Sequence, residues 1–318
     1  MTVLTQSDRT QSHGTGRSVL RHHKVRLGLA IFALMLTGAA AHPVLQATIW
    51  NGQDSIYGPE IGHDRALEHP TGPSVAHPLG TDALGRDVLS TLTFSLAPAL
   101  QVTVLAALLV GLLSITVGSL AAYFRGWVDL AVTSIGDAVT LLPPAIALLV
   151  VGVGKPAFGM IDAGLLLGLL YGLGPAALVV RSRALQVIEK PFLDAARMAG
   201  SGPGRIIRTQ MLPHLLPYAG IQMMGAGIGA LTSVAFIQYL GATDQSRVGL
   251  GSMIYTAIDF QPVLPTGAGY GSFNMGDFHA RIGWTSLLAA GVAMTLIAAA
   301  FYLIAVGSRD AVIPNARR

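Results

Sequence analysis

Long apolar stretches alternate with short polar segments along this chain. Six of the apolar stretches reach the roughly 20 residues that a helix needs to cross a lipid bilayer. They are Leu27–Ile49, Pro98–Phe124, Leu130–Gly154, Ala157–Val180, Pro217–Gly241 and Ile282–Val306. A short turn around Lys155 separates the third stretch from the fourth. The pattern predicts an all-α polytopic membrane protein with six transmembrane helices.

The composition supports this prediction. Hydrophobic residues make up 52% of the chain, charged residues only 11%, and the mean hydropathy is +0.58. Soluble domains carry about 25% charged residues, so most of this chain cannot face water. The chain has no cysteine, which excludes disulfides, a thiolate metal site and a cysteine nucleophile.

The charged residues predict the orientation of the spans. The segment before the first span holds five basic residues against Asp8, and residues 181–208 hold six basic residues against two acidic ones. The intervening loop 50–97 is acidic. An excess of Lys and Arg marks the cytoplasmic side, so we expect both termini and the 181–208 loop there. The net charge of +4 is therefore assigned to lipid headgroups and orientation, not to nucleic acid.

These expectations divide the chain into consecutive segments. They are a disordered basic tail (1–26), a first transmembrane helix (27–49), an extracytoplasmic loop (50–97), a core with five transmembrane helices (98–306) and a cytoplasmic tail (307–318). The basic residues before Leu27 and the small residues Ala39–Ala41 also fit a cleavable signal peptide. We favour an uncleaved span, because the apolar run continues beyond Ala41 to Trp50.

The loop 186–217 reads as two short helices joined by a turn. Pro191 suits the first position of a helix, and Asp194 would lie in its first turn, where the helix dipole favours a carboxylate. Gly200 is a natural helix stop. A second helix, Arg205–Leu212, is expected to end at Pro213. A plain basic loop would explain the arginines but not the joint spacing of these residues.

This loop resembles the EAA motif, with which membrane subunits of binding-protein-dependent ABC importers dock onto their ATPases. The matching residues are Asp194, Ala195, Ala196, Gly200, Leu212 and Pro213. Asp194 stands where the motif more often has Glu, and Gln210 stands where an aliphatic residue is usual. The resemblance implies that small residues let the ATPase approach closely.

A segment before the second span resembles C-type permease subunits of the dipeptide, oligopeptide and nickel importer family. The matching residues are Gly80, Thr81, Asp82, Gly85, Arg86 and Asp87. The segment Gly126–Asp129 and the ending Gly307–Ala311 are also similar to this family. At the outer ends the match is weaker: Ala235–Leu240 and Gly249–Gly251 depart from the family's pattern.

The resemblance implies a type I ABC importer permease in the bacterial cytoplasmic membrane. The chain would form half of a translocation pathway for di- or oligopeptides, with nickel or another metal chelate as the alternative substrate. The implied partners are a second permease subunit, two cytoplasmic ATPases and an extracytoplasmic binding protein. ATP and Mg would bind the ATPases, because no Gly-x4-Gly-Lys-Ser/Thr motif occurs in this chain. We expect no cofactor and no enzymatic activity in this chain.

A self-sufficient secondary transporter is an alternative from another class. It would require paired intramembrane charges or an inverted repeat, and the acidic residue farthest inside an apolar run is Asp137. We expect Asp137 to make a structural contact near the inner interface. The histidines predicted outside lack the spacing of metal ligands, so we expect them to be solvated; they are His42, His63, His69, His77 and His279. The loop 243–281 is expected to form part of the outer mouth.

Overall fold

The computed structural model describes residues 22–67, 70–155, 158–241, 248–258 and 284–312. Within these ranges the regular structure is helical, apart from one isolated bridge between Thr81 and Asp87. The first half contains α2 (His23–Thr48), α3 (Asp54–Tyr57), α4 (Val88–Phe124), α5 (Gly126–Thr140) and α6 (Pro144–Gly154). The second half contains α7 (Met160–Leu173), α8 (Pro175–Ile188), α9 (Pro191–Met198), α10 (Pro203–Ile206), a π-helical turn (Ile207–Met211), α11 (Leu212–Tyr239), α12 (Leu250–Ile258) and α14 (Trp284–Val312).

Five helical runs in the described residues are long and apolar enough to cross a membrane. They are His23–Thr48, Val88–Phe124, Met160–Ile188, Pro203–Tyr239 and Trp284–Asp310. The helices α5 and α6 pass the same test together, but they meet at an angle of 82°. The all-helical architecture agrees with the prediction, and the count is six when the bent pair is taken as one span.

The start of α4 differs from the one expected. The helix α4 begins at Val88, ten residues before Pro98, so the end of the expected outer loop is helical. The hydroxyl groups of Thr91 and Ser95 donate hydrogen bonds to backbone carbonyls four residues earlier, at 3.0 and 2.6 Å. These bonds satisfy the polar groups inside the helix, which is why a polar stretch continues the span.

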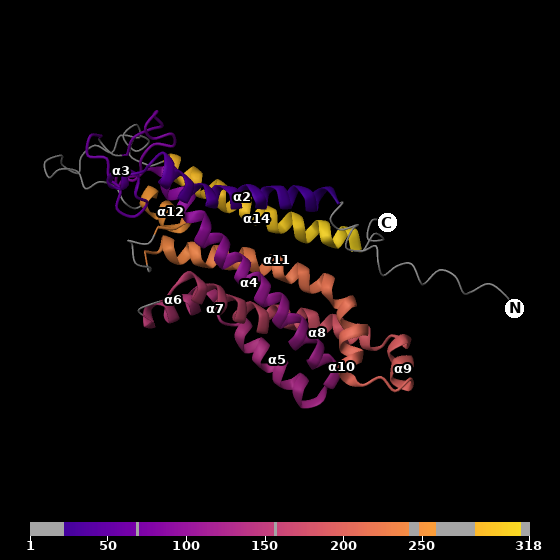
Figure 1. The fold of residues 1–318 in the computed structure, drawn as a ribbon. Coiled ribbons are helices and arrows are strands. Elements are labelled where there is room, and N and C mark those ends of the chain that lie inside the picture. The colour runs from indigo at the N-terminus through magenta and orange to yellow at the C-terminus, as the bar shows by residue number, and fades with distance from the viewer. Residues whose placement is uncertain (1–21, 68–69, 156–157, 242–247, 259–283, 313–318) are drawn as a thin grey trace.

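The helix α4 lies at the centre of the molecule and packs against α2, α7, α8 and α11 (Figure 1). Glycines make two of these contacts close. A Cβ atom at Gly168 of α7 would lie 2.8 Å from the Leu109 side chain, and one at Gly118 of α4 would lie 2.9 Å from the Arg181 backbone. Small residues that let helices approach closely are typical of membrane bundles.

The helices α2 and α14 lie side by side along one edge (Figure 1). A Cβ atom at Gly28 of α2 would lie 2.9 Å from the Ala300 carbonyl oxygen of α14. The rings of Phe32 and Phe301 pack edge to face, with centroids 5.8 Å apart. At the ends of the two helices, Lys24 Nζ pairs with Asp310 Oδ2 at 2.7 Å. These contacts join the first and last described helices.

Candidate functional site

The expected docking loop is an exposed helical hairpin with a buried base. Pro191 occupies the first turn of α9, and Asp194 lies in the same turn, as predicted. The Leu193 side chain is fully buried, and it packs in one cluster with Val180 and Ala184 of α8 and Leu215 of α11. The hairpin is therefore fixed to the helices that cross the membrane.

The helix α9 ends at Gly200 in the geometry of a glycine C-cap. Gly200 has φ of +78°, its N–H donates to the Arg197 carbonyl at 2.9 Å, and the Ser201 N–H donates to the Ala196 carbonyl at 3.0 Å. This is the hydrogen-bond pattern of a Schellman ending, which favours glycine. A Cβ atom at Gly200 would meet no atom within 4 Å, so the turn faces open space.

The six motif residues do not form one surface patch of equal exposure. Asp194, Ala195 and Gly200 are exposed, whereas Ala196 is half-buried. Asp194 Oδ1 accepts a hydrogen bond from Arg197 Nη1 at 3.0 Å, and the Arg197 guanidinium lies 5.8 Å from the Tyr123 ring centre at the end of α4. The exposed surface here therefore combines small residues with one acidic and one basic side chain.

The second helix of the hairpin does not end at Pro213, contrary to the prediction. The helical run continues from Pro203 to Tyr239, and Pro213 lies in the first turn of α11. A π-helical turn, Ile207–Met211, immediately precedes the proline. A proline ring clashes with the carbonyl four residues earlier in an α-helix, and a wider turn relieves this clash. The loop is thus continuous with a spanning helix, with Leu212 half-buried at the junction.

The segment Gly80–Asp87, which is the outer block of the expected topology, forms a closed turn that starts α4. Asp82 Oδ1 accepts hydrogen bonds from the Leu84 and Arg86 N–H groups, both at 2.9 Å, and Asp82 Oδ2 pairs with Arg86 Nη2 at 2.7 Å. Asp87 Oδ1 accepts from the Ser90 N–H at 2.7 Å and so caps the first turn of α4. Gly80 and Gly85 have φ of +77° and +82°. All six signature residues are buried, including Thr81.

A buried histidine, His77, packs against this block. The sequence pattern does not predict its burial. His77 is fully buried, so the expectation that it is solvated is wrong. Its Nδ1 lies 2.8 Å from Asp87 Oδ2 and its Nε2 lies 3.4 Å from Asp64 Oδ2. Burial raises the pKa of Asp87, while the hydrogen bond from His77 acts in the opposite direction. The pKa of Tyr57, whose ring lies beside His77, is also raised by burial and by these two carboxylates.

The other histidines have separate outcomes. His63 is exposed, and its Nδ1 lies 2.9 Å from the Leu84 carbonyl oxygen. His42 is half-buried and packs against the Phe94 ring at 5.2 Å. His69 and His279 lie outside the described residues. Within the described ranges, no His and acidic side chains are grouped as a metal site would require.

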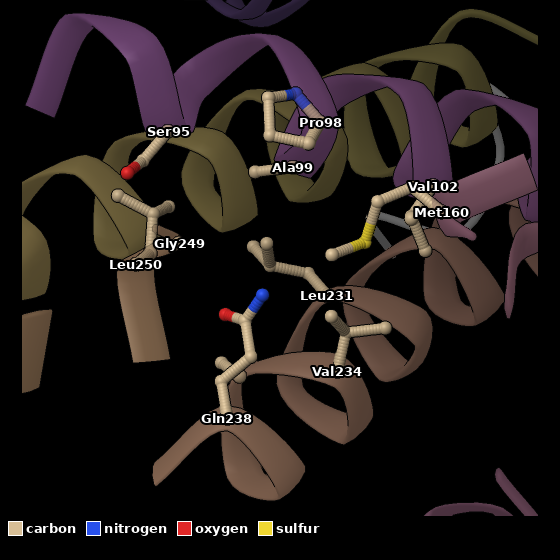
Figure 2. A pocket seen from close by; sticks show the side chains of 11 residues that line it. Ser95, Pro98, Ala99, Val102, Met160, Leu231, Val234, Gln238, Gly249 and Leu250 are labelled. Atoms are coloured by element: carbon tan, nitrogen blue, oxygen red, sulfur yellow. The ribbon is translucent and has the colours of Figure 1, made fainter. Parts of the chain in front are cut away.

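A small cavity lies between α4, α7, α11 and α12, near the end of the bundle where α4 begins. Figure 2 shows the Gln238 amide directed into it. The Gln238 Oε1 atom accepts a hydrogen bond from the Gly251 N–H at 3.1 Å, which ties α11 to α12. The cavity volume is about 10 Å³, roughly what one water molecule needs. It is therefore too small to hold a peptide.

The two sequence motifs lie at opposite ends of α4. The outer block and α3 lie at one end, and α9 and α10 lie at the other (Figure 1). A helix of 37 residues is about 55 Å long, so neither motif contacts the other. The two motifs are therefore separate regions joined by spanning helices.

Comparisons with known proteins identify a transport family. Residues 114–318 match the family described as binding-protein-dependent transport system inner membrane component. A putative peptide transport system permease protein of Brucella abortus is 28% identical over 95% of this chain and 91% of its own length. The dipeptide transport system permease protein DppC of Alkalihalophilus pseudofirmus is 27% identical over 77% of this chain and 74% of its own.

A third relative matches over nearly the whole chain. The oligopeptide transport system permease protein OppC of Mycobacterium bovis is 25% identical over 95% of this chain and 94% of its own length. The family match covers more than half of the chain and includes the last part of α4, the bent pair, the hairpin, α8 and α11. The chain is a multi-pass membrane protein, and it belongs to the family of inner-membrane components of binding-protein-dependent transport systems.

Proposed function

We propose that this chain is a permease subunit of an ABC importer and forms half of a translocation pathway for di- or oligopeptides. The observation that carries the proposal is the exposed hairpin α9–α10, whose buried base is packed against α4, α8 and α11. A partner that moves this hairpin would move the spanning helices with it. The names of the three relatives above favour peptides over a nickel or metal chelate.

The proposal includes a topology. Both termini and the hairpin lie in the cytoplasm, and the block Gly80–Asp87 lies outside, in the bacterial cytoplasmic membrane. The N-terminal end of α2 and the C-terminal end of α14 lie at the same end of the bundle as α9 (Figure 1). The segments at this end of the bundle carry an excess of basic residues. Excess Lys and Arg mark the cytoplasmic face.

The proposal also assigns the partners. A second permease subunit completes the pathway, two ATPases bind the hairpins, and a binding protein delivers the peptide outside. ATP and Mg bind the ATPases. Asp194, Ala195, Ala196, Gly200, Leu212 and Pro213 belong to the docking region, and the six signature residues of the outer block fix the start of α4.

The test is to purify the tagged chain with its partners from native membranes and reconstitute it in liposomes. We expect a second permease and ATPases to co-purify, and we expect binding-protein-dependent uptake of a labelled dipeptide that requires ATP. Uptake of a nickel chelate in place of a peptide would contradict the proposal that the substrate is a peptide. Transport by the isolated chain without ATP would favour the secondary transporter instead.

A further inference from the structure

The bent pair α5–α6 is the least covered part of the membrane-spanning structure. In α5 only Gly136 is buried, and in α6 only Leu148. The side chains of Leu130, Leu141 and Val153 are 67%, 82% and 74% exposed. Most of this surface therefore faces away from the body of the subunit.

Asp137 lies in the middle of the exposed face of α5. On a helix with 3.6 residues per turn, it shares this face with Leu130, Ser134 and Leu141. Asp137 and Ser134 are both exposed. No described side chain donates a hydrogen bond to the Asp137 carboxylate. The structural contact expected from the sequence is thus not a hydrogen bond within the described subunit.

Contact of this face of α5 with lipid would be energetically unfavourable. In lipid, an aspartate within a membrane helix costs up to about 2.5–3.5 kcal/mol on insertion scales, the largest cost being at the helix centre. Four residues after Asp137, the chain bends by 82° at Leu141–Pro143. Irregular backbone at membrane depth is tolerated only where protein or water satisfies its polar groups. Two independent features therefore require water or protein beside this face.

The charge around Asp137 favours water. The Arg181 guanidinium of α8 pairs with Asp129, with Nη2 and Oδ2 2.6 Å apart, and Asp137 acts on the same guanidinium from farther away. Arg125 also attracts Asp129, so both cations of this region act on Asp129, whereas no described cation lies within ion-pair distance of Asp137. A protein interface would have to supply a cation for this charge, whereas an aqueous pathway hydrates it directly.

We propose that the face of α5 carrying Ser134 and Asp137 lines the transport pathway, where the Asp137 carboxylate attracts the positively charged group of the transported solute. For a peptide this group is the α-ammonium or a basic side chain. The identity of the solute rests on the proposed function, but contact of this face with water does not.

The first test is the reactivity of single cysteines, since the chain has none of its own. Asp137→Cys is placed in the assembled transporter, whose partners are made cysteine-free, and is treated with small water-soluble methanethiosulfonates. The matched control is Ile135→Cys, which is at nearly the same depth but about 160° around the helix and is 55% exposed in the wild-type chain. We expect Asp137→Cys to react and Ile135→Cys to stay unmodified. An unreactive Asp137→Cys in both the resting and ATP-bound states would overturn the proposal.

The second test measures the local charge. Ser134→Cys leaves Asp137 intact, and its reaction with a cationic reagent should be roughly five- to tenfold faster than with an anionic one, as expected for a unit charge about 7 Å away in water. Adding Asp137→Asn should bring this ratio close to one, whereas Asp137→Glu should preserve it. A ratio unaffected by Asp137→Asn would contradict the assigned role.

The third test is uptake. Asp137→Asn should lower dipeptide uptake several-fold, and Asp137→Glu should retain most of it. Full uptake by Asp137→Asn would contradict the proposal that the Asp137 carboxylate attracts the solute. If the wild-type complex carries no peptide at all, the proposed substrate fails, and the cysteine reactions still decide whether this face lines a pathway.

Discussion

The imidazole of His77 is enclosed by acidic groups at the outer end of α4. Both ring nitrogens face carboxylate oxygens, of Asp87 at 2.8 Å and Asp64 at 3.4 Å. An ionised carboxylate only accepts hydrogen bonds, so the ring supplies the donor that the buried Asp87 needs. Asp87 also caps α4 with its other oxygen. One side chain thus links the loop to the first turn of a spanning helix.

His77→Leu is expected to destabilise the protein by about 3–5 kcal/mol, because it leaves a buried carboxylate without its partner. The control is the double variant His77→Leu/Asp87→Asn, which removes the unpaired charge and keeps a capping side chain. It should recover part of the loss. Trp50, which stacks on Tyr57 beside His77, reports unfolding by fluorescence in detergent. An unchanged unfolding temperature for His77→Leu would rule out the role described here.

A substitution at Gly80 tests whether the tight turn in the same block requires glycine. It has φ of +77°, and a Cβ atom there would overlap the Thr71 carbonyl oxygen. Gly80→Ala should therefore cost at least about 1–2 kcal/mol of stability. The matched control is Gly72→Ala, where a Cβ atom meets nothing within 4 Å. Equal thermal stability of the two variants would show that the turn is not under this constraint.

At the scale of an element, the hairpin must be rigid at its base and accessible at its tip. Gly200→Glu places a bulky charge at the exposed turn, so we expect peptide uptake and peptide-stimulated ATP hydrolysis to fall at least tenfold while the complex stays in the membrane. The measurement is uptake in liposomes, with the amount of assembled permease determined on the same sample.

Backbone strain at Gly200 needs a separate control, because its φ is +78°. Asparagine tolerates this conformation better than most residues and adds no charge. Gly200→Asn should therefore retain most of the uptake. If Gly200→Glu transports as well as Gly200→Asn, the tip of the hairpin does not meet the ATPase.

Local sequence patterns predict some features of the helices and miss others. The apolar stretches identify the spans, and Asp194, Pro191 and Gly200 predict α9 because capping depends on neighbouring residues. The early start of α4 is missed, because Asp87 becomes a cap only when the outer block closes around it. The burial of His77 is missed for the same reason: its partners lie 10 and 13 residues away, and only the folded loop brings them together.

At the scale of the whole molecule, two motifs distant in sequence lie at opposite ends of one bundle. The block Gly80–Asp87 begins α4, and the cluster that includes Ala122 near the end of the same helix holds the base of the hairpin. Packing of α4 against α7, α8 and α11 joins these ends. We therefore expect a displacement of the hairpin to be transmitted to the outer block through helices and not through a flexible loop.

This arrangement predicts the accessibility of the two ends across the membrane. Val75 in the outer loop is fully exposed, and Gly204 in the hairpin faces open space, so a cysteine at either position leaves the packing intact. Gly62 is less suitable because it is buried and a Cβ atom there would overlap the Gly58 carbonyl oxygen. In intact cells, an impermeant maleimide should modify Val75→Cys and leave Gly204→Cys unmodified, and both should react after the membrane is permeabilised. The reverse pattern would place the hairpin outside, where no cytoplasmic ATPase could reach it, and the proposed coupling of ATP hydrolysis to transport through α9 would have to be abandoned.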